Sequence, residues 1–505
     1  MAKHYDVVIL GAGIGALSAA ALLARRSWRV LVLGQGYRPA SYAYDGLPVA
    51  RRAFNFHASQ SPAWGRVIVE LAQSQTFRRR LAPHDPVLGV LSPGRRLEIP
   101  TDATFFGREI DREFPGIRRV VDEFYAELAR TCSLADSAFE RDVVLPPGGF
   151  WERRETDRAL ASLPHLQDTA GGDLLAEFSR DHPYRGVIEI AARFASDLAD
   201  PIPPFALARL HGAWIRPVRL ARGEEELTEF LVERVRAHGG DVNLSERATS
   251  IAHRGGKVTG VLVDGDDAPT GAPFIVSDLP TAALLDLAPG FAPSRRAMSQ
   301  LPAVHPRTWR FVVSILVHDR GIPQPLAAES FLVPDPPAYT VHLQRTKGPG
   351  DTTLLVAEAL LESDSRGKVA AARERVLATV EQFMPFVERH YLLVDSPHDG
   401  RPLWDYREGE RKSVDRTRVR ASGGSLEAEP MPVQWDADPL QLHGLGAEPL
   451  RTPLSGAFVL GRTTLPALGQ EGELLAAWGV ARIITRTDRR KERMRRDMWS
   501  KVELG

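Results

Sequence analysis

The sequence has a single cysteine, Cys132, among its 505 residues, and no net charge. One thiol excludes an internal disulfide and is typical of proteins from a reducing compartment. The 64 basic and 64 acidic residues balance, so nucleic acid is not an expected partner. No stretch reaches the roughly 18 apolar residues that a membrane-spanning helix needs, and residues 1–6 lack the apolar core of a signal peptide. We therefore expect a cytoplasmic protein, with peripheral membrane contact left open.

Sequence motifs of metal binding and of covalent catalysis are also missing. The fourteen histidines are dispersed, and none stands in the HExxH pattern of zinc enzymes. No Gly-x-Ser-x-Gly segment marks a serine nucleophile, and the single cysteine has no motif of a reactive thiol. The sequence therefore predicts no metal site, and it leaves the catalytic residues unidentified.

What the sequence does contain is a glycine-rich segment close to its start. Residues 7–10 form an apolar run that stops at glycine and is followed by small and aliphatic residues at helical spacing. This pattern is typical of a buried parallel strand that leads into a helix, the opening of a dinucleotide-binding fold. Gly11 permits the tight turn, and Gly13 lets the backbone approach a pyrophosphate at the helix N-terminus. The predicted phosphate-binding residues are Gly11, Gly13, Ile14, Gly15 and Ala16.

The end of the second predicted strand, residues 28–33, departs from this pattern. An Asp or Glu that binds the adenosine ribose is expected there, about 20 residues beyond the glycines. The sequence instead has Gly34 and Gln35, neither of which carries a carboxylate. Gln35 still offers an amide oxygen to a ribose hydroxyl, and it is therefore included among the cofactor-binding candidates.

The rest of the chain divides into two kinds of segment. Residues 61–215 are predicted to be mostly helical, while three strand-like runs lie within residues 308–360. We therefore expect an α/β protein, in which a Rossmann-like FAD-binding domain (a parallel sheet with helices) carries a mixed α+β substrate domain with an antiparallel sheet and a helical insert. The predicted dinucleotide-binding domain comprises residues 1–60, 216–300 and 451–487, and the predicted substrate or cap domain comprises residues 61–215 and 301–450.

The predicted C-terminal tail, residues 488–505, is basic. From Arg486 to the end of the sequence, eight basic side chains stand against four acidic ones. This balance is typical of a solvated final helix, and it also suits contact with an anionic membrane surface or an acidic protein partner. Both interpretations stay open from the sequence.

Together with the glycine loop, two further stretches resemble the phytoene desaturase and carotenoid isomerase branch of the FAD-dependent amine oxidase superfamily. Residues 221–240 resemble that family's mid-chain helix and glycine pair, and Ala248 begins the strand whose backbone contacts the flavin adenine in the family. Residues 455–479 resemble its C-terminal flavin motif. The resemblance implies FAD as the cofactor, and it adds these candidate cofactor-binding residues: Ala248, Gly461, Arg462 and Gly472.

Departures from the family pattern fall on this cofactor site. Arg462 stands where the family usually has an acid, and Gly34 replaces the ribose-binding acid. Glu471 and Glu473 begin the helix that faces the flavin ring in the family, where two carboxylates would repel the negative charge of a reduced flavin. The resemblance therefore implies a degenerate FAD site.

The sequence leaves two functional hypotheses of different classes. In the first, an FAD-dependent oxidoreductase of phytoene desaturase type desaturates, oxidises or isomerises an apolar small molecule such as a polyene, and the cofactor supplies the chemistry. In the second, a non-catalytic relative keeps the fold, has lost or altered FAD binding, and serves in binding or assembly. A flavin that is bound without turnover is a third, intermediate case.

Overall fold

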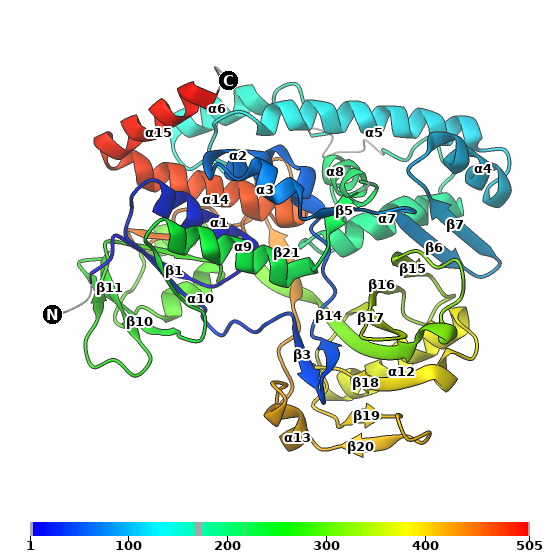
Figure 1. The fold of residues 1–505 in the computed structure, drawn as a ribbon. Helices are drawn as coiled ribbons and strands as arrows, with labels where there is room; N and C mark the ends of the chain where they lie inside the picture. The colour runs from blue at the N-terminus through cyan, green and yellow to red at the C-terminus, as the bar shows by residue number, and fades with distance from the viewer. Residues whose placement is uncertain (1–3, 167–173, 217, 503–505) are drawn as a thin grey trace.

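The computed structural model describes residues 4–166, 174–216 and 218–502. Two large β-sheets are surrounded by helices, and the chain passes between the two sheets several times (Figure 1). One sheet is parallel with helices against it, and the other is mixed and largely antiparallel. The expected α/β fold class is confirmed.

The parallel sheet has the strand order β22-β13-β1-β2-β9. Its central strands are short apolar runs that are buried on both sides, as expected for strands covered on both faces. Helices cover one face of the sheet, and a small three-stranded sheet covers the other. Successive strand residues point to opposite faces, so alternate residues belong to two different hydrophobic clusters. The strands are β1 (Val7–Leu10), β2 (Val30–Leu33), β9 (Asp241–Asn243), β13 (Phe274–Ser277) and β22 (Ala457–Val459). The covering elements are α1 (Ile14–Arg25), α9 (Gly223–Ala237) and α14 (Gly469–Arg486) on one side, and β10 (Ala248–Arg254), β11 (Lys257–Val263) and β12 (Thr270–Gly271) on the other.

The second sheet has ten strands and is built around the long strand β14 (Ala303–His318). Its order is β20-β19-β18-β14-β17-β16-β15-β6-β7, and β21 also pairs with β14. The antiparallel sheet that was predicted within residues 308–360 is confirmed. The other strands are β6 (Leu88–Ser92), β7 (Arg95–Ile99), β15 (Glu329–Leu332), β16 (Val341–Lys347), β17 (Thr352–Leu361), β18 (Tyr391–Asp395), β19 (Leu403–Asp405), β20 (Lys412–Val414) and β21 (Val433–Asp438).

The prediction of a mostly helical region 61–215 was wrong for residues 88–99. These residues form the β6–β7 hairpin at the edge of the ten-stranded sheet, closed by a turn in which Gly94 has a φ of 72°. The other elements of the region are largely helical (Figure 1). They are α2 (Pro62–Glu70), α3 (Ser74–Arg78), α4 (Ala103–Glu113), α5 (Arg118–Phe139), α6 (Phe150–Leu160), α7 (Pro183–Ala195) and α8 (Pro204–Trp214), with β5 (Leu81–Pro83) and β8 (Val218–Leu220) as a two-stranded pair.

The remaining elements are short, apart from α12. Helix α12 packs against β14, β15, β16 and β17 and covers one face of the ten-stranded sheet. The elements are β3 (Ser41–Tyr44), β4 (Leu47–Ala50), η1 (His57–Gln60), α10 (Thr281–Asp286), α11 (Arg295–Met298), η2 (Asp319–Gly321), α12 (Arg366–Phe383), η3 (Val387–His390), α13 (Arg416–Ala421) and η4 (Pro466–Leu468).

The described part of the basic C-terminal segment is a helix, α15 (Arg489–Val502), that packs against α14. Trp499 donates its indole N–H to Glu70, and the Lys491 ammonium lies 3.6 Å from the centre of the Trp28 ring. Arg495 binds Asp142 at 3.0 Å. Some of the basic side chains of the predicted tail therefore contact the rest of the protein and stabilise the position of this helix. Contact of the tail with a membrane or a partner stays a prediction.

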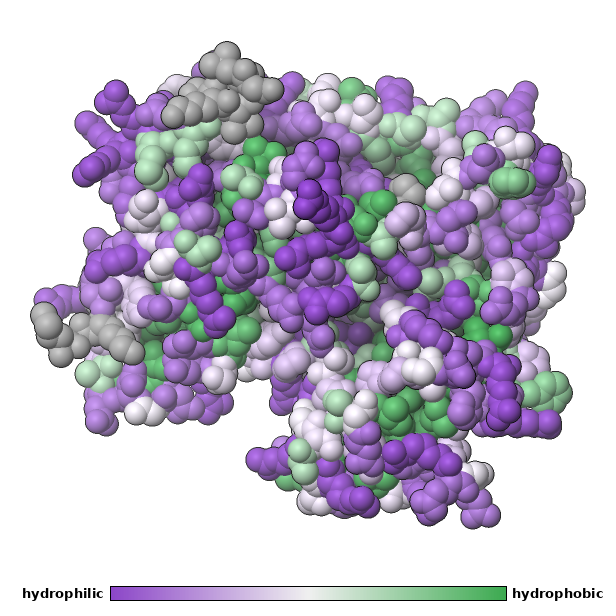
Figure 2. All heavy atoms as spheres, in the orientation of Figure 1, coloured by the Kyte–Doolittle hydropathy of each residue, from purple (hydrophilic) through white to green (hydrophobic). Residues whose placement is uncertain are grey.

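The length and hydrophobicity of the helices bear on membrane insertion. Within the described ranges, no helix combines the length and the hydrophobicity needed to cross a bilayer. Hydrophilic side chains cover most of the face shown in Figure 2, and hydrophobic residues form only small patches on it.

Candidate functional site

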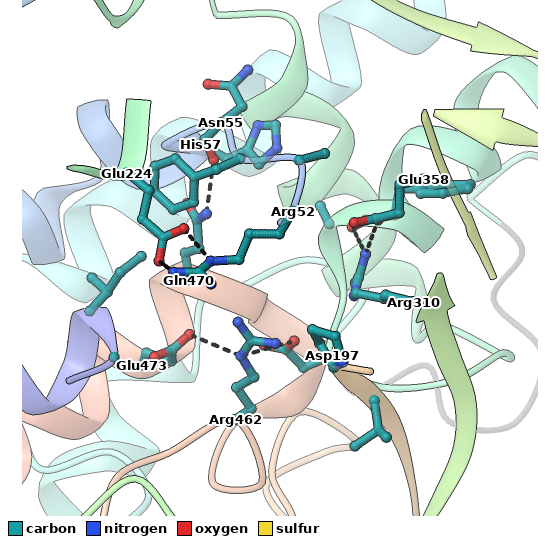
Figure 3. A pocket seen from close by; sticks show the side chains of 18 of the residues that line it. Arg52, Asn55, His57, Asp197, Glu224, Arg310, Glu358, Arg462, Gln470 and Glu473 are labelled. Atoms are coloured by element: carbon teal, nitrogen blue, oxygen red, sulfur yellow. Dashed lines mark hydrogen bonds and ion pairs between the residues drawn. The ribbon is translucent and has the colours of Figure 1, made fainter. Parts of the chain in front are cut away.

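A cavity of about 400 Å³ lies where the carboxyl ends of β1, β13 and β22 meet the ten-stranded sheet. Ligands of open parallel sheets bind at this edge. Among the candidate residues from the sequence, the cavity wall includes Gly13, Ile14 and Arg462. Figure 3 shows that charged side chains from distant parts of the chain converge on this space.

The charged side chains of the wall number three arginines and five carboxylates. Two of the arginines have a close partner: Arg52 binds Glu224 with two hydrogen bonds, and Arg310 binds Glu358 at 2.7 Å (Figure 3). Arg462 is the remaining arginine. The cavity therefore has more negative than positive charge wherever its carboxylates are ionised.

The other three carboxylates of the wall, Asp197, Asp278 and Glu473, surround Arg462, which forms no hydrogen bond with any of them in the described structure. Its Nε lies 3.9 Å from Asp197 and 4.0 Å from Glu473, beyond the range of a hydrogen bond (Figure 3). Its side chain is 47% accessible and lines the cavity. Its nearest charged partners are acids of the same chain, and its contact with a cofactor stays a prediction.

Asp278, which follows β13, fills the hollow of the glycine loop. Its Oδ2 accepts a hydrogen bond from the Gly13 N–H at 3.0 Å. A Cβ atom on Gly11, which has a φ of 116°, would lie 1.9 Å from Asp278 Oδ1. On the next turn, the Gly15 N–H donates to Glu473 Oε2 at 3.4 Å. Two backbone donors that a dinucleotide-binding loop offers to phosphate are therefore engaged by carboxylates of this chain.

Burial acts strongly on these acids. Burial raises the pKa of Asp197 and of Asp278. The positive charge of nearby Arg462 lowers both pKa values, but it offsets the effect of burial only in part. For Glu473, burial raises the pKa to about 7, with a further upward contribution from the charge of Asp197. Glu473 is therefore partly protonated near neutral pH, where an ordinary glutamate is ionised.

The Glu473 carboxyl makes the protein sensitive to pH in a direction that can be measured. Its pKa in the folded state lies above the ordinary value of 4.5, so its stabilising contribution is complete below about pH 4.5 and is lost as the pH rises to about 7. We expect the Glu473→Gln variant to gain stability relative to the wild type over this range, by about 3 kcal/mol. Urea unfolding at several pH values measures the difference.

Glu471 provides a control of opposite sign. Hydrogen bonds and charge from Arg209 lower its pKa against the effect of burial, so its contribution is present above the ordinary pKa and is lost on acidification. The deficit of Glu471→Gln relative to the wild type should therefore grow, not shrink, as the pH rises through 4.5. Equal slopes for the two variants would contradict the assignment.

Glu471 also corrects a detail of the sequence analysis. The carboxylates of Glu471 and Glu473 were expected to face the same cofactor space, but only Glu473 lines the cavity. Glu471 binds Arg209 at 2.6 and 2.7 Å and accepts a hydrogen bond from Ser61. The two side chains are two positions apart on α14, so they leave the helix about 200° apart and point to different surroundings.

The predicted adenosine end of the site is closed by the protein itself. The Gln35 side chain accepts a hydrogen bond from the Ala248 N–H at 2.9 Å and donates to the Ala248 carbonyl at 3.0 Å. Neither residue lines the cavity. A Cβ atom on Gly34 would lie 1.9 Å from the Leu244 carbonyl oxygen, so a glutamate at position 34 does not fit. The structure brings Gln35 and Ala248 together, but they bind each other.

Three other candidate residues serve close packing. Ala16 is fully buried in α1. A Cβ atom on Gly461 would lie 2.1 Å from the Asp278 carbonyl oxygen, and one on Gly472 would lie 2.3 Å from that of Leu465. Neither glycine is part of the cavity wall. Their small size is required by the neighbouring backbone.

The described residues do not fit a dinucleotide phosphate in the usual position of this fold. A phosphate charge about 4 Å from one carboxylate costs on the order of 4 kcal/mol at the effective dielectric constant of a protein site. A pyrophosphate at the loop would meet both Asp278 and Glu473, and Arg462 would be the one cation of the cavity wall near those two acids. The adenosine would also have to separate Gln35 from Ala248.

Sequence reasoning missed most of the cavity wall. Asp278 had a usable signal, since an acid directly after a predicted parallel strand lies at the same sheet edge as the glycine loop. The residues of the ten-stranded sheet that reach the cavity gave no signal, because strand alternation alone does not say which face meets a cavity; they are Arg310, His342 and Glu358.

Comparison with known proteins supports the fold. Residues 9–71 match the family model of the NAD(P)-binding Rossmann-like domain. An oxidoreductase from Methanosarcina mazei is 16% identical over 94% of this chain and 100% of its own, with a TM-score of 0.57. Putrescine oxidase bound to putrescine is 16% identical over 95% of this chain and 99% of its own, with a TM-score of 0.58.

A third solved structure, the PF1083 protein from Pyrococcus furiosus, is 14% identical over 94% of this chain and 95% of its own, with a TM-score of 0.53. A search of curated proteins gave no match. The predicted fold is therefore confirmed, while the superfamily and its phytoene desaturase branch stay predictions. Residues 9–71 are similar to the NAD(P)-binding Rossmann-like domain, and the chain as a whole has a fold similar to that of putrescine oxidase.

Proposed function

We propose that the protein binds a small polar molecule in the central cavity and does not hold FAD in the usual position of its fold. One observation carries this proposal: Asp278 Oδ2 accepts the Gly13 N–H at 3.0 Å, so the loop is engaged by an acid of the chain. Of the two functional hypotheses, this one belongs to the binding class.

The size and chemistry of the cavity support a small ligand. Its volume of about 400 Å³ lies within the usual range of small-molecule pockets, and Gln35 and Ala248 close the end at which an adenosine would extend. Aromatic and polar side chains share the wall, among them Trp214, Trp435 and Asn55. A molecule with both apolar and hydrogen-bonding surface suits this lining.

An FAD-dependent oxidoreductase that acts on a lipophilic substrate is the second candidate. The spacing of the glycine loop favours it, as does the match of residues 9–71 to a dinucleotide-binding family. Under this hypothesis Asp278 and Glu473 would have to leave the loop before a pyrophosphate could bind. The cofactor would then supply the electron transfer, and the protein would supply binding and orientation.

The absorption spectrum of the purified protein separates the two candidates. We expect no flavin band in the visible region, and no uptake of added FAD after dialysis, because the loop donors are engaged. Putrescine oxidase prepared in the same way serves as a control of the same fold. A stoichiometric flavin band in the native protein would overturn the proposal in favour of the oxidoreductase.

A further inference from the structure

Four charged or polar side chains form a row across the ten-stranded sheet beneath the cavity. They come from the neighbouring strands β14, β17, β16 and β15, on the face turned away from α12. His342 and Glu358 stand directly opposite each other in the register of β16 and β17. The row, in order, is Arg310, Glu358, His342 and Glu329.

Each half of this row is an ion or hydrogen-bonded pair. Arg310 binds Glu358 at 2.7 Å and also donates to the carbonyl oxygens of Phe194 and Ser196. His342 Nε2 lies 2.8 Å from Oε2 of Glu329, which has no accessible surface. Arg310 thus bonds to protein groups only, whereas the imidazole of His342, in the second pair, lines the cavity.

The hydrogen bonds of Glu329 fix the state of this imidazole. The side-chain amide of Gln344 donates a hydrogen bond to Glu329 Oε1 at 2.9 Å. Burial raises the pKa of Glu329, but the bonds from His342 and Gln344 outweigh this effect, so the pKa lies below its usual value. An ionised carboxylate accepts, so Nε2 of His342 carries the hydrogen. Nδ1 then has the free lone pair, and no hydrogen-bond partner for it occurs in the part of the chain that the structure describes.

The other imidazole of the cavity wall has a different character. The His57 ring lies 4.1 Å from the Trp214 ring, and burial lowers its pKa to about 3. His57 therefore stays neutral and is a weak proton acceptor. Of the two imidazoles, His342 is the one that is hydrogen-bonded to a carboxylate.

The cavity wall contains more acids than arginines, so a neutral ligand suits it better than an anion. The polar groups of the wall favour a ligand that carries hydroxyl groups. Amide side chains of Asn55 and Gln470 line the same space as the aromatic ring of Trp214. An aromatic ring beside amides and carboxylates suits a molecule with an apolar face and several hydroxyl groups. The cavity volume of about 400 Å³ accommodates a compound of the size of a simple sugar.

We propose that His342 is a general base that transfers a proton within a neutral hydroxylated ketone or aldehyde bound in this cavity, with Glu329 as its positioning residue. The proposal rests on the proposed function, small-molecule binding in the central cavity, and adds an activity and a ligand class to it. It needs no bound cofactor.

The step balances within the ligand and the imidazole. Nδ1 of His342 takes a proton from a carbon that bears a hydroxyl group next to a carbonyl. The electron pair of that C–H bond becomes the second bond of a C=C, and the carbonyl π pair moves to oxygen, which gives an enediolate. The imidazolium balances the negative charge on this oxygen and then returns its proton. Return to the same carbon restores the ligand. When the former carbonyl carbon takes the proton instead, the hydroxyl hydrogen passes to the neighbouring oxygen, so that the carbonyl and hydroxyl positions are exchanged.

Solvent deuterium reports this step without knowledge of the natural ligand. Dihydroxyacetone and D-fructose, two neutral hydroxyketones, are incubated with the protein in D2O, and the loss of their C–H signals is followed by proton NMR. We expect exchange above the buffer rate with the wild type, and a loss of about 100-fold or more in His342→Gln, the usual range for a general base. His398→Gln, which replaces a buried histidine outside the cavity wall, should exchange like the wild type.

Glu329 variants test positioning against a merely structural role. Replacement by glutamine should slow exchange while the binding of the probes is kept, since an amide stabilises the imidazolium less than a carboxylate. Glu358, Arg310 and His57 also face His342, and they are unchanged in this variant. Glu329→Asp should restore the exchange rate in part. Thermal unfolding checks that each variant is folded.

The outcomes separate this proposal from the proposed function. Saturation-transfer NMR reports binding of the same two probes. Binding without exchange, or exchange that survives in folded His342→Gln, would overturn the role of His342 and leave small-molecule binding intact. Neither binding nor exchange would overturn the ligand class, and FAD uptake in the spectrum would overturn the proposed function itself.

Discussion

Removing the two carboxylates from the glycine loop should turn it into a phosphate site. We expect the double variant Asp278→Ala with Glu473→Gln to bind inorganic pyrophosphate at least ~100-fold more tightly than the wild type. The Gly13 and Gly15 N–H groups become free at the N-terminus of α1, and Arg462 loses two of the acids around it. An ionised carboxylate at about 4 Å repels a phosphate charge by on the order of 4 kcal/mol. Partial protonation of Asp278 and Glu473 reduces this figure for each acid, and the two together still exceed the roughly 2.7 kcal/mol of a 100-fold change.

Isothermal titration calorimetry with pyrophosphate measures this gain, and FAD is titrated in parallel. The variant Asp197→Asn is the control, because it removes a carboxylate near Arg462 from the cavity wall but leaves both loop amides engaged. We expect no comparable gain in the control. If both variants gained equally, the effect would come from the charge around Arg462, and the specific role of Asp278 would be wrong. FAD should gain less than pyrophosphate, because Gln35 still closes the adenosine end.

Replacing Arg26 with methionine should lower the free energy of unfolding by about 3–5 kcal/mol, the cost of leaving a buried charge without its partner. Arg26 and Glu70 have no accessible side-chain surface, and two hydrogen bonds of 2.6 and 3.0 Å join them. Arg26 also donates to Thr485, and Trp499 donates to Glu70. The pair therefore connects α1, α2, α14 and α15, and Glu70 would keep only the indole N–H as a side-chain partner.

Urea unfolding followed by circular dichroism measures the loss. Arg29→Met is the matched control, because Arg29 binds Asp6 at 3.2 Å on the surface, where the arginine side chain is 61% accessible. Surface pairs of this kind contribute about 0–1 kcal/mol, so the control should change little. The double variant Arg26→Met with Glu70→Met should recover part of the loss, since no buried charge is left. A loss below 1 kcal/mol in Arg26→Met would show that water reaches the site.

The glycine loop shows how far local pattern carries a prediction. An apolar run, a glycine turn and a run of small residues were enough to place β1, α1 and the parallel sheet, because these features act within about 20 residues. The ten-stranded sheet was predicted in part for the same reason. Its β6–β7 hairpin was missed because it lies inside a mostly helical region and finds its partner strand, β15, more than 200 residues away.

The candidate site was predictable at its backbone and not at its side chains. Gly13, Ile14 and Arg462 line the cavity, because the turn after a strand fixes their place at the sheet edge, and their role in cofactor binding stays a prediction. Gln35 was a candidate because it offers an amide to a ligand, and tertiary structure gave that amide to Ala248 instead. A local sequence pattern does not predict which of two possible hydrogen-bond partners a side chain will bind.

The sequence by itself determined the Rossmann-like fold, the position of the loop and the loss of the ribose-binding acid, since these depend on residues close together in the chain. Only the tertiary structure decided what the loop holds. Asp278 is 265 residues from Gly13, and Glu473 is 458 residues from Gly15. Burial, which raises the pKa values of both acids, arises only when those segments meet. A motif fixes the donors of an anion site, and the packing of distant segments decides which anion they bind.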